Sequence, residues 1–300
     1  MQSELVLDKK YKTALVINYV QATQLFLIRC IHGIVKHDKD SIDCIIVSIN
    51  DVLGFNEDET EFFEQMKLSV NKSGIDFHYF NNGGKFESSQ QAYIFGKLKE
   101  SGTNDIVYLH EDCFIEKDNC IDELVSGTKR NAKVFGGIVF QTNEYYTARN
   151  ELFYFNCEQI SEYFDVSKGK TWSGQTLPDG DKVDAGTGLL SYYFFHNRHL
   201  MHSFDFSDYI KHPGDLLKSY HINSEYYNVA NDFFNFRESI AWFINNQNTP
   251  KFLDQLFAKQ YSYIVSMVQE GVVIESFDNN WMVSDNVKRM PTLQYMLRKK

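Results

Sequence analysis

Short apolar runs alternate with longer amphipathic segments over the first 140 residues of the chain. Five of the apolar runs have the length and continuity of strands that are buried on both faces: 13–19, 43–49, 76–80, 105–109 and 133–140. The segments between them space their apolar residues as helices do: 21–36, 58–71, 88–101 and 119–130. Alternation of strand and helix with short connections predicts an α/β fold, in which helices flank a mostly parallel sheet.

The pattern changes in the second half of the chain. Residues 142–182 are rich in Gly, Asp and aromatic residues, which predicts an irregular excursion with a short strand at 152–155. Order resumes over 183–195, and helical spacing returns over 226–246 and 253–270. We found no internal repeat and no separating linker. We therefore expect one domain over 1–250 and a C-terminal helical extension with a basic tail over 251–300.

Composition narrows the class of protein. The chain has 43% hydrophobic residues, 17 Gly and only 4 Pro, so it can bury a large core and is not of a disordered type. Its net charge of −10 disfavours a nucleic-acid partner. Five cysteines without a CxxC pair predict reduced thiols. The first residues lack a signal peptide's apolar core, and no run approaches the ~20 apolar residues of a membrane span, so we expect a cytoplasmic protein.

Candidate ligand-binding residues follow the ends of the predicted strands. Ligands of parallel α/β sheets bind beyond the carboxyl ends of the strands. This rule selects Asn18, Asp51, the run from Asn82 to Lys85, and 110–112. A carboxylate at Asp51 could accept hydrogen bonds from a nucleobase or a ribose, although a simple turn residue fits the position as well. No GxGxxG follows the first strand, so a dinucleotide-binding site is not indicated.

The sequence His110-Glu111-Asp112 is the strongest local signal for a metal site. Acidic side chains that leave a buried strand are costly unless a partner neutralises them, and a divalent cation is such a partner. A cation here would neutralise charge on a departing nucleoside diphosphate. The alternative is that both acids cap the turn and face water.

Two later segments could contact a sugar or an acceptor. Asp184 and Gly186 precede an apolar run, where a carboxylate could hold sugar hydroxyls and a glycine allows close backbone approach; a tight turn explains them equally well. Asp232 opens an aromatic-rich helix. It could deprotonate an acceptor hydroxyl, or it could simply be an acid in the first helical turn.

These segments, taken in order, resemble the inverting, bacterial-type family-two glycosyltransferases of the GT-A (Rossmann-like) fold. The resemblance rests on TALVINY, DCIIVSIND, NNGGKF, DIVYLHED, KVFGG, DAGTGLLSYYFFH and NVANDFFNFRESIAWFINNQNTPKFL, over residues 13–255. It implies a nucleotide-sugar donor, UDP-linked, and a Mn²⁺ or Mg²⁺ cofactor.

The resemblance also implies roles for single residues. Asp51 would lie by the nucleobase, Asp112 would bind the metal, Asp184 would touch the donor sugar and Asp232 would be the base. Asn18, Lys85 and Glu111, selected by their places at strand ends, and Gly186, selected as a glycine that allows close approach, are further candidates for donor contacts. The chain departs from the family pattern at His110, where the family usually has its first aspartate.

Other functions remain open at this point. Nucleotidyltransferases share the fold class but carry a Gly-rich basic loop after the first strand, and 18–23 has no glycine or lysine. A non-catalytic sugar-nucleotide-binding or assembly protein fits the atypical metal motif, and a DNA-modifying glycosyltransferase is disfavoured by the acidic balance. The acceptor would be a glycan or a lipid-linked glycan. The basic tail over 286–300 predicts either peripheral contact with the inner membrane face or a solubilising end.

Overall fold

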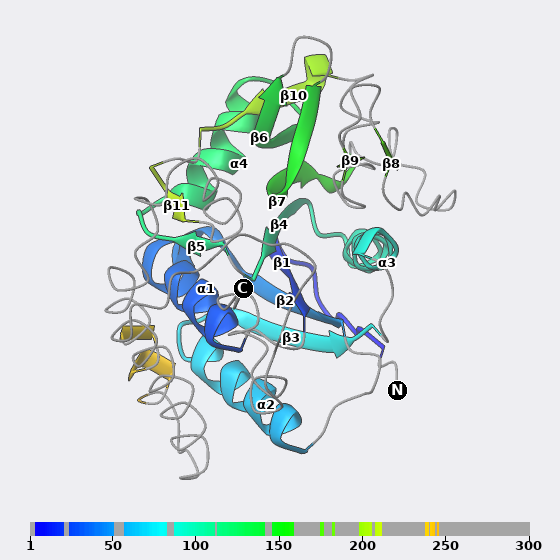
Figure 1. The fold of residues 1–300 in the computed structure, drawn as a ribbon. Helices are drawn as coiled ribbons and strands as arrows, with labels where there is room; N and C mark the ends of the chain where they lie inside the picture. The colour runs from blue at the N-terminus through cyan, green and yellow to red at the C-terminus, as the bar shows by residue number, and fades with distance from the viewer. Residues whose placement is uncertain are drawn as a thin grey trace.

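The chain folds around a seven-stranded mixed sheet (Figure 1). The computed structural model describes residues 4–20, 24–50, 57–82, 87–111, 113–141, 146–158, 175–176, 182–183, 198–205, 208–211, 238–239, 241–243 and 245. The strands of the large sheet are β1 (Thr13–Val20), β2 (Cys44–Asn50), β3 (Asp76–Asn81), β4 (Asp105–His110), β6 (Phe135–Gln141), β7 (Tyr146–Asn156) and β10 (Met201–Ser203). Their order is β10-β6-β7-β4-β1-β2-β3.

Strand directions give the sheet one common carboxyl edge over its first half. β1 pairs in parallel with both β2 and β4, and β2 pairs in parallel with β3. β7 is antiparallel to β4 and to β6, and β10 is parallel to β6. Two small sheets accompany the large one. They pair β5 (Phe114–Ile115) with β11 (Ile210–Lys211) and β8 (Gln175–Thr176) with β9 (Lys182–Val183).

Helices cover both faces of the large sheet. They are α1 (Gln24–His37), α2 (Glu57–Asn71), α3 (Glu87–Glu100) and α4 (Cys120–Arg130), with short 3₁₀ turns at Lys39–Ser41 and Arg198–Leu200. One core cluster joins α1, α2 and α4 to one face, and a second joins α3 and the N-terminal segment to the other. The predicted α/β architecture, a mostly parallel sheet with flanking helices, is confirmed.

The predicted irregular excursion over 142–182 is wrong where β7 lies. β7 has 11 residues and passes between β4 and β6, so it completes the sheet. Only its apolar C-terminal part, Leu152 to Phe155, was visible in the sequence, and these residues are fully buried. The flanking residues are held by pairing with β6, and their own composition does not specify a strand.

A C-terminal segment packs on the helices of the first core cluster. Residues 238–239, 241–243 and 245 are helical, as expected for 226–246. Phe243 is fully buried and lies 5.5 Å from Phe62 of α2 between ring centroids. Trp242 stacks on His32 of α1 at 5.1 Å. This segment is therefore part of the domain core, whereas the extension over 251–300, with its basic tail, lies outside the described residues.

All five cysteines are free and buried, as predicted for reduced thiols. Within the described ranges, no helix is both long and apolar enough to cross a membrane.

A carboxylate from one helix caps the start of another. Asn119 has a left-handed backbone at the N-cap of α4 and makes no side-chain capping bond. Asp38, which follows α1, accepts a hydrogen bond from the Ile121 backbone N–H at 2.9 Å instead. Burial raises the pKa of Asp38 to about 6, even though backbone N–H groups of α4 oppose this shift. The contribution of Asp38 to the free energy of unfolding therefore depends on pH.

We expect Asp38→Asn to change how stability depends on pH. Between pH 4 and 6 an unfolded aspartate ionises while folded Asp38 stays protonated, so wild-type stability falls as pH rises through this window. The asparagine variant lacks this loss. The difference in unfolding free energy, variant minus wild type, should grow by roughly 2 kcal/mol, given ~1.4 kcal/mol per pKa unit. Urea unfolding across this pH range measures it, and a flat difference would contradict the assignment.

His32 provides the matched control because it titrates in the opposite sense. Burial lowers the pKa of His32 to about 4, so the folded protein favours neutral imidazole. The contribution of His32 to the wild-type free energy of unfolding is fully present above pH 6.5, and it is lost as pH falls toward 4. The difference between His32→Gln and wild type should therefore decrease as pH rises, which is the reverse of the Asp38 result.

Candidate functional site at the carboxyl edge of the sheet

Polar side chains gather where the parallel strands end. Because β1 to β4 run in one direction, their last residues lie at the same edge of the sheet. Among the described side chains at this edge are six polar ones, all of them buried except that of His110: Asn18, Ser48, Asn81, Asn82, His110 and Glu111. Such a concentration of buried polar groups beside an apolar core is typical of a ligand site.

Three of these residues form a row on the face covered by α3. In β1, Leu15 and Ile17 pack toward α1, whereas Ala14 and Val16 pack on the α3 side, so strand alternation places Asn18 on the α3 side. Asn18 is in register with Ser48 on β2 and with His110 on β4. The His110 ring contacts Tyr108 of the same face at 5.7 Å.

Hydrogen bonding distinguishes Asn18 from its neighbours. The side-chain amide of Asn82 donates to the Ser48 hydroxyl at 3.1 Å, which closes the row on the β3 side. The Asn18 side chain is about nine-tenths buried, and within the described part of the chain its Oδ1 has no hydrogen-bond partner. A buried acceptor without a donor costs ~1–3 kcal/mol. Asn18 therefore presents an acceptor suited to an N–H or O–H group of a ligand.

Glu111 brings a carboxylate to the same edge. It directly follows β4 and is buried. The chain turns immediately afterwards, because the Cys113 backbone N–H donates to the His110 carbonyl at 3.1 Å. Carboxylate and imidazole groups are both ligands of divalent cations. Of the described residues, no three His, Cys, Asp or Glu side chains converge into a metal site.

The remaining predicted site residues lie outside the described residues. They are Asp51, Lys85, Asp112, Asp184, Gly186 and Asp232. The structure thus places Asn18 and Glu111 at the ends of the adjacent strands β1 and β4, and the roles predicted for all eight residues stay predictions.

Sequence reasoning missed two residues of the edge. Asn81 is the last residue of β3, and Ser48 holds the position in β2 that pairs with Asn18 in β1, yet the sequence analysis selected Asn18 and not these two residues. A signal for Ser48 was present, since it is the one hydroxyl residue in the apolar run from Cys44 to Ile49.

Comparison with known proteins finds similarity only among solved structures. No protein-family model and no curated protein matches the chain. Among solved structures, the glycosyltransferase GlyE of Streptococcus pneumoniae is similar at 12% identity and a TM-score of 0.44, over 65% of this chain and 45% of GlyE. A second GlyE structure is matched over 66% of its length, so in both cases the match spans only part of GlyE.

Two further structures are similar to the same degree. The 1–349 fragment of S. aureus TarS has 9% identity and a TM-score of 0.44, over 86% of this chain and 88% of the fragment. A Bacillus anthracis protein, provisionally a glucose-1-phosphate thymidylyltransferase, has 11% identity and a TM-score of 0.44, over 67% and 90%. Similarity at this level does not establish an activity, so the fold assignment rests on the strand order described above.

Proposed function

We propose that this protein is a glycosyltransferase that moves a sugar from a nucleotide-diphosphate sugar, UDP-linked, to a hydroxyl of a glycan or lipid-linked acceptor. The donor binds at the carboxyl edge of β1, β2 and β4. A divalent cation, Mn²⁺ or Mg²⁺, assists the reaction.

The unpaired Oδ1 of Asn18 is the observation that carries this proposal. An unpaired buried acceptor in a row of polar side chains favours a ligand with a donor group, such as the imide N–H of uracil or a ribose hydroxyl. The buried carboxylate of Glu111 lies at the end of the adjacent strand β4, so the base or ribose and the diphosphate would bind at neighbouring strand ends.

The roles of the donor-side residues follow from their chemistry. Asn18 and Asp51 accept hydrogen bonds from the nucleoside, and Glu111 and Asp112 supply oxygen ligands for the cation. When bound, the cation stabilises negative charge on the leaving diphosphate. Lys85 adds a positive charge near the phosphates. Asp184 holds hydroxyls of the sugar, and Gly186 lets the backbone approach it.

On the acceptor side, Asp232 serves as the general base. It takes the proton of the acceptor hydroxyl while that oxygen forms a bond to the anomeric carbon. The bond from this carbon to the diphosphate breaks on the opposite face, so the configuration inverts. A positioned base contributes ~10²–10⁴-fold to such a step.

We expect Asn18→Ala to weaken donor binding without destabilising the fold. The variant removes an acceptor that a ligand would use, so the affinity for UDP with Mn²⁺ should fall about 3- to 10-fold, the worth of one hydrogen bond. The same change removes an unpaired buried group, so the melting temperature of the free protein should hold or rise. Titration calorimetry and thermal unfolding measure the two effects. A variant that binds UDP as wild type does would overturn the assignment of Asn18.

Turnover separates an enzyme from a binding protein of the same fold. Purified protein should release UDP from a UDP-sugar in the presence of Mn²⁺, and more rapidly with acceptor. NMR of the product's anomeric centre tests inversion. Donor binding without any UDP release would instead support the non-catalytic alternative.

A further inference from the structure

Glu111 belongs to a stretch of chain, here called the Glu111 segment, whose described residues are 110–111 and 113–119. This segment lies along helix α1. The Cys30 thiol lies 3.8 Å from the His110 carbonyl oxygen, at the start of this segment. Farther along, His37 Nδ1 lies 2.6 Å from an oxygen of Asp118, and the Asn119 backbone N–H donates to the His37 carbonyl at 3.1 Å. Helix α1 therefore serves as a template for the described residues between 110 and 119.

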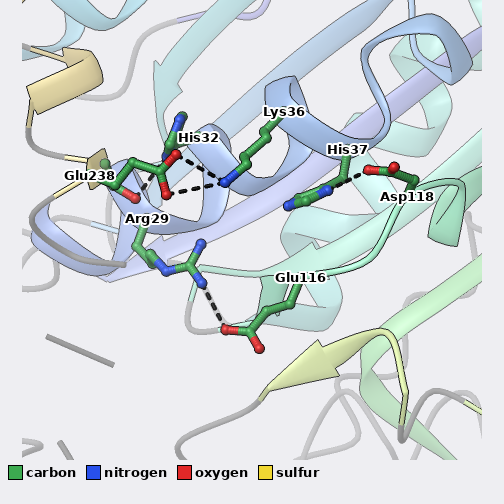
Figure 2. A network of polar contacts seen from close by, with 8 residues as sticks. Arg29, His32, Lys36, His37, Glu116, Asp118 and Glu238 are labelled. Atoms are coloured by element: carbon green, nitrogen blue, oxygen red, sulfur yellow. Dashed lines mark hydrogen bonds and ion pairs between the residues drawn. The ribbon is translucent and has the colours of Figure 1, made fainter. Parts of the chain in front are cut away.

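Arg29 contributes a largely buried polar contact to this template. Its Nη2 donates to Glu116 Oε1 at 2.8 Å, and the arginine side chain is only 6% exposed (Figure 2). The guanidinium also lies over the ring of Phe114, 5.4 Å from its centroid. Arg29 thus holds two residues of the segment at once, three and five positions after Glu111.

Helix α1 packs closely on β5 next to Arg29, so the backbone of 113–116 has little room to shift relative to the helix. A Cβ on Gly33 would come within 2.7 Å of the Ile115 carbonyl oxygen, so the helix backbone lies directly on the strand. Cys113, Phe114 and Ile115 are all fully buried in the same core cluster. A shift of Glu116 or Phe114 would therefore be passed to the turn at 110–113.

We propose that Arg29 is a positioning residue, which fixes the Glu111 turn at the carboxyl edge by holding Glu116 and Phe114. The proposal rests on the proposed function for its effect on the donor. Arg29 itself touches neither donor nor cation. Residues that orient a ligand-binding group typically change metal affinity or activity by ~10- to 100-fold when they are removed.

The first experiment measures the turn itself and needs no ligand. Hydrogen exchange of the Cys113 amide reports the bond from this amide to the His110 carbonyl. Arg29→Ala should raise its exchange rate at least about tenfold, whereas Arg29→Lys, which keeps the charge beside Glu116, should give an intermediate rate. Lys36→Ala is the matched control, because Lys36 lies on the same helix but pairs with Glu238 of the C-terminal segment (Figure 2). Exchange unchanged in Arg29→Ala overturns the proposal.

The second experiment is a double-mutant cycle on binding of UDP with Mn²⁺. Glu111→Gln and Arg29→Lys should each weaken binding, and the double variant should bind nearly as well as Glu111→Gln alone, because both changes act on one group. Lys36→Ala should leave binding at the wild-type value. Fully multiplicative effects of the two substitutions overturn the positioning role.

The two experiments separate the two proposals. If wild-type protein does not bind UDP with Mn²⁺ but Arg29→Ala frees the Cys113 amide, the proposed function fails and the hold of Arg29 on the turn stands. If donor binding is present and exchange is unchanged, the proposed function stands and the role of Arg29 is wrong.

Discussion

Replacing Phe243 by alanine is expected to lower the free energy of unfolding by about 3–5 kcal/mol, the usual cost of removing a buried aromatic side chain. Phe243 is fully buried and belongs to the core cluster that also contains Phe62 and the apolar face of α1. The loss would show that a segment more than 80 residues beyond β7 is part of the same cooperative unit. Urea unfolding, followed by far-UV circular dichroism, measures it.

Asn245→Ala is the control for this prediction. Asn245 is helical and exposed two residues away, so its replacement should change stability by less than about 0.5 kcal/mol. If Phe243→Ala unfolds at the same urea concentration as wild type, the packing of this segment on α1 and α2 is wrong.

Gly33→Ala is the second change with a large expected effect. Alanine favours helix over glycine by ~1 kcal/mol. At Gly33, however, the new Cβ would lie 2.7 Å from the buried carbonyl oxygen of Ile115, so α1 or β5 must move. Overpacking of this kind costs ~1–3 kcal/mol and more where backbone is the obstacle. We expect a net loss of about 2–3 kcal/mol.

Gly96→Ala tests the same substitution in open space. Gly96 lies inside helix α3, and no described residue comes within 4 Å of a Cβ built there. Only the helix propensity acts, so this variant should gain about 0.5–1 kcal/mol. Opposite signs at Gly33 and Gly96 would verify the contact of α1 with β5. A gain at both would mean that the two elements are farther apart than described.

The first half of the fold was predictable from the sequence because its elements are specified locally. Each parallel strand is a continuous apolar run and each helix has one apolar face, so β1 to β4 and α1 to α4 were found within a few residues of their true ends. The strand β7 was not found at its full length. Its outer residues depend on pairing with β6, which the sequence does not display.

The site was predictable only as far as topology determines it. Asn18 and Glu111 follow from the rule that ligands bind at carboxyl edges. The support of the Glu111 turn was not predictable, because Arg29 and Glu116 are 87 residues apart in the chain. The same holds for His32 and Ser239, which are 207 residues apart and meet at 2.9 Å. No local pattern links such pairs.

Because all five thiols are buried, we expect the native protein to react slowly with alkylating reagents. Thiolate is the reactive species, and burial raises the pKa of Cys157 to about 11 and raises the pKa of Cys44 and Cys120 further. Four of these residues lie on or next to different elements: Cys30 on α1, Cys44 in β2, Cys113 next to β5 and Cys120 at the start of α4. The order in which they become labelled under mild denaturant would therefore show which element opens first, and a single cysteine added at exposed Leu68 would carry a dye without background.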